Sequence, residues 1–169
     1  VVKLLIERGA NPFAIDYWQR TPFHYCSNEV LEIYKVLQPD PEIWPTFISD
    51  PTKYKLFKYL LSDDDLDRKY VNGKTLLYMA AQQGVLELVK ILVERGATLE
   101  TAHSLGSTPL HAACYAGQIS VVKYLIALSN PFAKNGTGQT CMQEMITNET
   151  LDPQKKEELK KIFKQYEKF

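Results

Sequence analysis

Apolar residues recur at helical spacing in two neighbouring stretches of the chain, and these two stretches repeat each other. Residues 106 to 125 read GSTPLHAACYAGQISVVKYL. This amphipathic pattern is interrupted at Gly117, where a residue without a Cβ can end one short helix and let the chain reverse into another. The same pattern occurs 33 positions earlier, with these shared residues: Gly73, Thr75, Leu77, Ala80, Gly84, Val89, Lys90 and Leu92. A fixed period of this length indicates stacked helix pairs, none of which can bury its apolar face without a neighbour.

The first helix of each pair has a recognisable start in the tetrapeptide at residues 108 to 111, Thr-Pro-Leu-His. Thr108 can cap the helix by accepting a backbone N–H, and Pro109 suits the first helical position, where no amide donor is needed. Leu110 then points into the core. The two alanines that follow are small enough for the next helix pair to approach closely.

This tetrapeptide and its period resemble the ankyrin repeat, a unit made of a turn and two helices. The resemblance is closest over residues 70 to 134 and weaker over 1 to 37 and 38 to 69. It implies an all-α helix-turn-helix solenoid with short hairpin loops. It also implies a hydrogen bond between His111 and the preceding turn, and partner docking on the concave side.

We predict a single domain, residues 1 to 169, built of about five units. They are a partial unit at 1–16, a shortened unit at 17–37, a degenerate proline-rich unit at 38–69, two regular units at 70–102 and 103–135, and a capping unit at 136–169. Because the chain opens on the second helix of a unit, without its partner helix, we expect it to be a piece of a longer protein.

The degenerate unit and the cap depart most from the repeat. Pro45 falls inside any helix drawn over residues 42 to 48, so such a helix can at most start or kink there. A helix is expected from about 52 to 62, and a charged final helix from Asp152-Pro153 onward. In that final helix the residues spaced to face the stack are Leu159, Ile162, Phe163 and Tyr166.

The composition of the chain excludes several classes of partner and location. Lys plus Arg and Asp plus Glu both number 20, giving zero net charge, so no long-range field favours nucleic acid or an anionic membrane. The three cysteines, Cys26, Cys114 and Cys141, lie in helical sequence and fit buried, reduced thiols better than a disulfide framework. No apolar run has the length of a spanning helix. We therefore expect an intracellular protein, cytoplasmic or nuclear.

Residue types that often carry chemistry have structural roles in this pattern. His24 and His111 occupy the same repeat position, and Tyr78 takes it in the unit between them. His103 has no Cys or His at metal-ligand spacing, and the acidic run at 63–67 lacks the spacing of a calcium loop. We predict no catalytic residue, metal, cofactor or small-molecule substrate.

The positions left for recognition are hairpin tips and exposed inner-helix positions, where the repeat tolerates any side chain. By register, the predicted protein-binding residues are Tyr17, Trp18, Arg20, Val71, Asn72, Lys74, Gln82, Gln83, His103, Ser104, Leu105, Ser107 and Tyr115, with Tyr70 and Ala116 beside them. Aromatic residues dominate interface energetics, so the two at 17 and 18 and the one at 115 stand out. An alternative is that Tyr17 and Trp18 pack against Trp44 and Phe47.

The sequence predicts a non-catalytic module that binds another protein, of unknown identity, on a rigid concave surface. Two alternatives remain open. The chain could be the substrate-recruiting arm of a larger enzyme, such as a ubiquitin-ligase adaptor or a microbial effector. It could also be a self-packing spacer that assembles end to end through its first helix.

Overall fold

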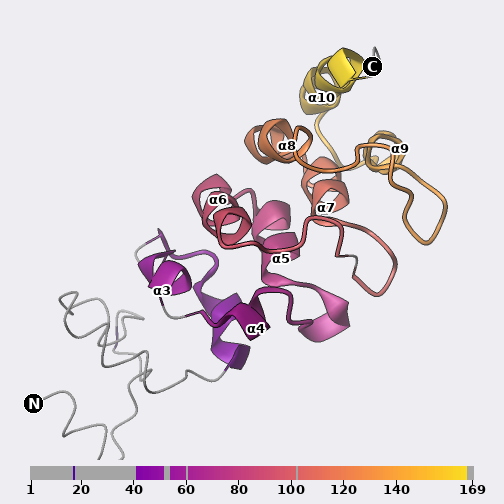
Figure 1. The fold of residues 1–169 in the computed structure, drawn as a ribbon. Helices are drawn as coiled ribbons and strands as arrows, with labels where there is room; N and C mark the ends of the chain where they lie inside the picture. The colour runs from indigo at the N-terminus through magenta and orange to yellow at the C-terminus, as the bar shows by residue number, and fades with distance from the viewer. Residues whose placement is uncertain (1–16, 18–40, 52–53, 60, 102, 167–169) are drawn as a thin grey trace, which may run out of the picture.

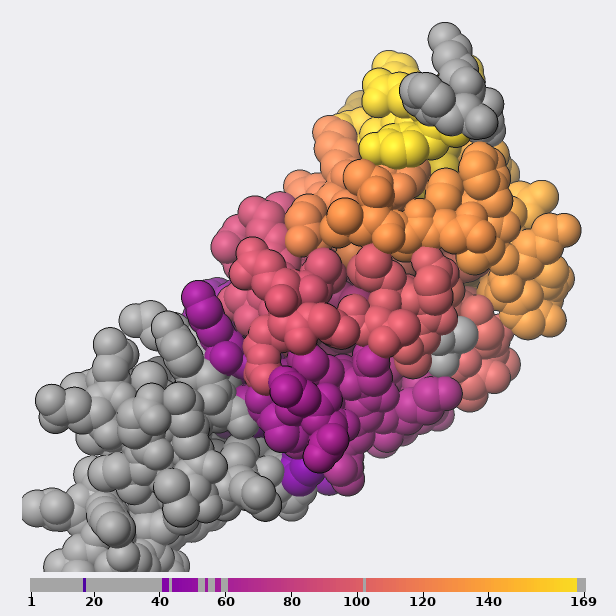
Figure 2. Space-filling model, viewed as in Figure 1, coloured from indigo at the N-terminus to yellow at the C-terminus, as the bar shows by residue number. Residues whose placement is uncertain are grey.

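The structure is a computed structural model that describes residues 17, 41–51, 54–59, 61–101 and 103–166. The expected helices within residues 1–16 and 18–40 lie outside the described residues. The described part of the chain forms an elongated stack of helices, which Figure 1 shows as a ribbon. In Figure 2 successive units appear as bands across the long axis of this stack.

Among the described residues the regular elements are helices, which turns and loops connect, and one isolated bridge joins Lys134 and Thr140. The elements in chain order are η2 (Pro41–Phe47), α3 (Tyr54–Tyr59), α4 (Asp63–Leu66), η4 (Val71–Gly73), α5 (Leu76–Gln83), α6 (Leu86–Glu94), α7 (Pro109–Tyr115), α8 (Ile119–Leu125), α9 (Cys141–Thr147) and α10 (Pro153–Tyr166). Helices α5, α7 and α9 pack side by side as an inner row, and α6, α8 and α10 lie behind them (Figure 1). The predicted all-α repeat fold is confirmed.

The inner helices begin as the sequence predicts. Helix α7 starts at Pro109, and Thr108 and His111 form a reciprocal capping pair at its N-terminus. Thr75 caps α5 by accepting the backbone N–H of Tyr78 at 3.2 Å. Each cap satisfies an amide that the first helical turn leaves without an intrahelical partner, and so fixes where the helix begins.

Glycine lets the next unit approach the ends of α5 and α7. Gly84 and Gly117 have φ of +79° and +68°, the left-handed region in which an added Cβ is strained. A Cβ on Gly117 would lie 2.4 Å from Cδ1 of Leu151 in the following unit. Leu151 therefore closes over the helix end because the glycine has no side chain.

Hydrogen bonds between main chains join successive hairpin tips. The N–H of Ser104 donates to the carbonyl of Asn72 at 3.2 Å, and the N–H of Gly136 donates to the carbonyl of Leu105 at 2.9 Å. A Cβ on Gly106 would lie 2.6 Å from the nitrogen of Gly136. Close approach of the tips therefore depends on glycine and gives the hairpin row a continuous backbone network.

The degenerate unit keeps a place in the stack with different elements. Its first helix is the short 3-10 helix η2, which contains Pro45 and packs against α5. Trp44 and Phe57 are buried, with ring centroids 5.1 Å apart. These two rings connect η2 with α3 inside the buried core of this unit.

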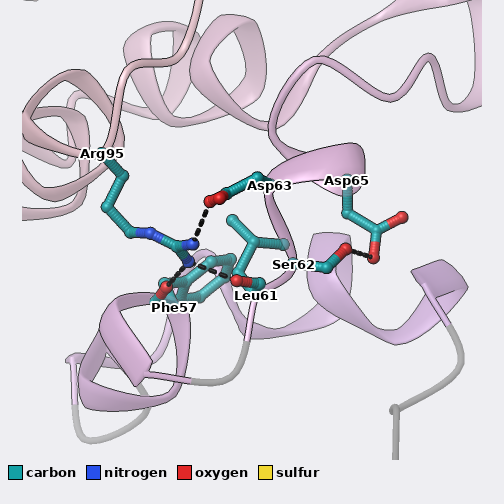
Figure 3. Close-up of polar contacts among 6 residues, drawn as sticks. All are labelled: Phe57, Leu61, Ser62, Asp63, Asp65 and Arg95. Atoms are coloured by element: carbon teal, nitrogen blue, oxygen red, sulfur yellow. Dashed lines mark hydrogen bonds and ion pairs between the residues drawn. The ribbon is translucent and has the colours of Figure 1, made fainter.

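The helix expected at about 52 to 62 is described as α3 over Tyr54–Tyr59, and residues 61 and 62 lie outside it, before the separate helical turn α4. The guanidinium of Arg95, at the end of α6, donates to the carbonyl of Phe57 at 2.9 Å and also to the carbonyl of Leu61. It pairs with Asp63 at 2.7 Å (Figure 3). A side chain from the next unit thus satisfies carbonyls at and just after the described end of α3.

The final helix, α10, closes the stack. Leu159, Ile162 and Phe163 are buried against the preceding unit, as predicted, and Tyr166 is partly buried. On the outer side Lys123 of α8 pairs with Glu158 of α10 at 3.0 Å. Within the described residues, no helix combines the length and the apolar character needed to cross a membrane.

Candidate protein-binding surface

Two apolar side chains project from consecutive hairpin tips. Val71 is 77% exposed and Leu105 is 69% exposed, although each is large and apolar. Asn72 and Ser104 at the same tips are also exposed. Asn72 has φ of +60°, a conformation that asparagine tolerates better than most residues. Four predicted binding residues therefore lie on the surface without a packing role.

Two residues of the expected tips are buried instead. Ser107 is 4% exposed and Tyr70 is 8% exposed. The N–H of Ser107 donates to Nδ1 of His103 at 3.2 Å, and the carbonyl of Ser107 accepts the N–H of His103 at 3.1 Å. These contacts close the hairpin and turn Ser107 inward, so we leave Ser107 and Tyr70 out of the candidate surface.

A stacked pair of rings connects the hairpin at residues 103–107 to the inner helix α5. The rings of His103 and Tyr78 are nearly parallel, with an interplanar angle of 16° and centroids 4.8 Å apart. Nζ of Lys74 lies 5.5 Å from the Tyr78 centroid and donates to Oε1 of Gln82 at 3.1 Å. Hairpin and helix are therefore fixed relative to one another by Tyr78 together with three side chains that sequence register assigned to binding: Lys74, Gln82 and His103.

The surroundings keep both rings neutral near pH 7. Burial, with a contribution from the negative charge of Glu144, raises the pKa of Tyr78 to about 12. Burial and the neighbouring charge of Lys74 lower the pKa of His103 below its usual value. Since Nδ1 of His103 accepts a backbone N–H, its single proton is on Nε2.

The ends of the inner helices border a second feature, a surface pocket of about 430 Å³. Gln82, Tyr115 and Ala116 line it from α5 and from the end of α7, together with residues of the segment that leads into α10. Tyr115 is 46% exposed. Gln83, also exposed, accepts a hydrogen bond from Ser49. Three residues that sequence register put at or beside the binding surface, at 82, 115 and 116, therefore line the same pocket.

His111 has the structural role that the sequence indicated. Its Nδ1 accepts the N–H of Thr108 at 3.3 Å, which leaves the ring proton on Nε2. Nε2 lies 3.3 Å from the carbonyl of Gln139 in the following hairpin. The ring is 1% exposed and bridges two units.

Glu144 is a surface feature that sequence reasoning missed. It lies in α9 at the repeat position held by Met79 in α5 and Ala112 in α7. Its Oε2 is shielded from solvent and accepts no hydrogen bond from any described residue. The one signal in the sequence was a charged residue at a position that is otherwise apolar.

The predictions for the first hairpin are only partly covered by the structure. Trp18 and Arg20 lie outside the described residues. Tyr17 is 91% exposed, so its ring is not buried against Trp44 and Phe47, which are themselves 1% and 3% exposed.

The two cysteines that the structure describes lie in the core. Cys114 and Cys141 are buried and free, and burial raises the pKa of the Cys114 thiol. Over the described ranges, no group of three or more His, Cys, Asp or Glu side chains is placed to hold a metal ion.

Comparison with known proteins agrees with this architecture. A family model described as ankyrin repeats, in three copies, matches residues 49–137. The chain is 35% identical to protein phosphatase 1 regulatory subunit 27 of Mus musculus over 100 residues, which are 59% of this chain and 60% of that protein.

Two further similarities concern proteins of other kinds. Palmitoyltransferase AKR1 of Saccharomyces cerevisiae is 40% identical over 87 residues, which are 49% of this chain and 11% of that protein. The Notch-regulated ankyrin repeat-containing protein of Xenopus tropicalis is 44% identical over 54 residues, 32% of this chain and 47% of that protein. In each case the chain matches less than two thirds of the relative's length.

Proposed function

Because the chain belongs to the ankyrin-repeat family, we propose that it is a non-catalytic module that binds another protein with its hairpin tips and inner helices. Ankyrin repeats are generally protein-protein interaction modules. The observation that carries the proposal is the exposure of Val71 and Leu105 at consecutive tips, 77% and 69%. Large apolar side chains in such positions favour contact with a partner over contact with water.

The arrangement of the stack supports a rigid mode of recognition. The tips are joined by main-chain hydrogen bonds, and the Tyr78–His103 stack connects a hairpin to an inner helix. Binding by a surface that is already ordered costs little conformational entropy. The capped helices and buried His111 also explain why the most distinctive residues of the repeat are unavailable to a partner.

A matched pair of leucines provides the test. Leu105 at a hairpin tip is 69% exposed, and Leu128, which follows α8, is 48% exposed. We expect Leu105→Asp together with Tyr115→Asp to weaken partner binding by more than about tenfold, since a central interface residue contributes about 2 kcal/mol or more. Leu128→Asp should leave binding unchanged.

The measurement is affinity capture from cell extract with quantitative mass spectrometry, on wild type and each variant at equal melting temperature. Proteins captured by wild type and by Leu128→Asp, and lost from the tip variant, are the expected result. Equal capture by the tip variant, or loss caused by Leu128→Asp instead, would contradict the proposed surface.

A second candidate function is the recruiting arm of a larger enzyme. It is favoured by the similarity to palmitoyltransferase AKR1, of which the matched region is 11%. Sequencing the transcript around this region distinguishes the two functions. An enzyme domain in the same reading frame would support recruitment of that enzyme's substrates, and its absence would favour a separate binding protein.

A further inference from the structure

The pocket at the ends of α5 and α7 is open to solvent and has room for a side chain of a partner. Its volume is about 430 Å³, within the usual range of ligand pockets. Among the residues that line it, Tyr115 is 46% exposed, and Thr150 and Lys155 are also exposed. A partner can therefore reach the lining without any rearrangement of the stack.

The chain segment that closes one side of the pocket is held against the end of α7. The side-chain amide of Asn148 donates to the carbonyl of Tyr115 at 2.8 Å. The side-chain oxygen of Asn148 accepts the N–H of Thr150 at 3.0 Å and its hydroxyl at 2.7 Å. Asn148 and Leu151 are each only 8% exposed. The pocket is therefore already formed in the free protein, so binding there orders little of the chain.

Lys155 contributes a cation to this pocket, and its stem has a defined place. A Cβ on Gly117 would lie 3.2 Å from Cδ of Lys155, so the stem lies against the end of α7 where the glycine leaves space. The ammonium of Lys155 forms no hydrogen bond or ion pair with any described residue. The neighbouring ammonium of Lys156, in contrast, donates to the carbonyl of Ile146 at 3.1 Å. Lys155 is thus a positioned cation without a counterion in the part of the chain that the structure describes.

Other donors in the lining are also unused among the described residues. Oε1 of Gln82 accepts from Lys74 at 3.1 Å, which leaves the amide N–H groups of Gln82 unpaired there, and the hydroxyl of Tyr115 is unpaired as well. The acid of the lining, Asp152, accepts the N–H of Gln154 at 3.4 Å in the first turn of α10, where the helix end offsets its charge. The unmatched groups are therefore donors and one cation, which are complementary to an anion.

We propose that this pocket receives a glutamate side chain of the protein partner, whose carboxylate accepts hydrogen bonds from Lys155 and Tyr115. The two methylene groups of the glutamate pack against the ring of Tyr115 and the side chain of Leu151. Glutamate fits better than aspartate because its additional methylene group is buried on binding. This inference rests on the proposed function, since it assigns one recognition element within the proposed surface.

The probe is a displayed library of random linear peptides, selected separately on wild type, Lys155→Met, Lys155→Glu and Lys164→Met. Methionine keeps an unbranched apolar stem and removes the charge. Lys164 is an exposed cation near the other end of α10, so its substitution makes the same change of charge away from the pocket. Each variant is first checked for unchanged melting temperature.

Wild type and Lys164→Met should select peptides with glutamate at one fixed position. Lys155→Met should bind those peptides about tenfold more weakly, as expected for a lost hydrogen bond between charged groups. Replacing the peptide's glutamate by glutamine should weaken binding to wild type by a similar factor and should change binding to Lys155→Met little, because the two groups act as a pair. Lys155→Glu should select a basic residue at the same peptide position.

A second pair of variants tests the space instead of the charge. Ala116 lines the pocket, whereas Ala127 is an exposed residue just after α8. Ala116→Trp should abolish binding of the selected peptides, because the indole ring occupies the volume that the glutamate needs. Ala127→Trp should bind them as wild type does.

Unchanged affinity in Lys155→Met, or selected peptides without a fixed acidic position, would overturn the inference. Equal binding to Ala116→Trp and wild type would also overturn it. If such peptides still lose binding in Leu105→Asp, the proposed function stands and only the glutamate pocket is wrong. Peptides indifferent to all of these substitutions, or no selected peptides at all, would count against the proposed surface and the pocket together.

Discussion

The two interfaces of α5 and α6 with their neighbours are built differently. Toward α7 and α8, the contact is between regular units with small inner-helix residues such as Ala80 and Ala113, both fully buried. Toward η2 and α3, it includes the side chain of Arg95, which bonds the carbonyl of Phe57, and lies beside the buried ring pair of Trp44 and Phe57. The same helix pair thus meets one neighbour through repeated geometry and the other through individual large side chains.

This difference shows where a repeat protein can vary. Between regular units, caps, glycines and alanines recur because backbones must come close at fixed distances. Next to the degenerate unit the backbones do not match, and long side chains fill the space and satisfy the carbonyls. Substitutions at the two interfaces should therefore change the free energy of unfolding for different physical reasons. The sizes of these changes can be ranked.

The largest expected effect is the loss of a ring at the irregular interface. Phe57 is fully buried, so Phe57→Ala should lower the free energy of unfolding by about 3–5 kcal/mol. Phe132 is 57% exposed, and Phe132→Ala should change it by less than about 0.5 kcal/mol. Urea denaturation measures both. Equal effects would mean that the irregular unit is not packed on the stack.

A smaller effect is expected from backbone spacing between regular units. Gly106→Ala should cost about 3 kcal/mol, from the strain of a Cβ at φ +79° and the loss of the hydrogen bond to the next tip. Gly138 has nearly the same φ, +78°, but open space around it. Gly138→Ala should therefore cost only about 1 kcal/mol. Similar losses of stability in the two variants would show that close approach of the tips is unimportant.

The cation at the irregular interface comes next. Arg95→Met leaves the carbonyls of Phe57 and Leu61 without this donor and should cost about 2 kcal/mol. Lys123→Met breaks a half-exposed ion pair with Glu158 and should cost under about 1 kcal/mol. The difference should persist at high salt, because hydrogen bonds to carbonyls are less screened than a surface ion pair. If the two losses were equal, Arg95 would act as an ordinary surface charge.

The smallest effect at neutral pH is expected at the Tyr78–His103 stack. The pKa of Tyr78 is raised to about 12, against about 10 in an unfolded chain. A raised folded-state pKa contributes stability that is fully present below pH about 10 and is lost as pH rises through about 12. Wild type should therefore lose stability relative to Tyr78→Phe between those values, as followed by alkaline unfolding. Parallel pH curves would contradict the burial of this hydroxyl.

The regular part of the fold was predictable from sequence because its signals are local. The pattern around Thr108 and Pro109 gives the start of α7, and Gly117 gives the reversal after it, without any knowledge of distant residues. The contact of Arg95 with the end of α3 was not predictable, because Arg95 lies 38 residues beyond Phe57 in the sequence. No local pattern carries that contact.

The candidate surface was predictable only in part, for a similar reason. Register correctly indicated that Val71, Leu105 and Tyr115 would be exposed. It could not show that Ser107 turns inward to close its hairpin, nor that Oε2 of Glu144 is shielded without a hydrogen bond from any described residue. Both facts depend on side-chain direction, which the repeat pattern does not specify.

The most direct test of the account is hydrogen exchange on the complex with a captured partner, read amide by amide against the free protein. We predict added protection at the hairpin tips, residues 71–74 and 103–107, and at the ends of α5 and α7, with α6 and α8 unchanged. Protection concentrated on α6 and α8, with the tips exchanging as in the free protein, would contradict recognition by the hairpin and inner-helix face.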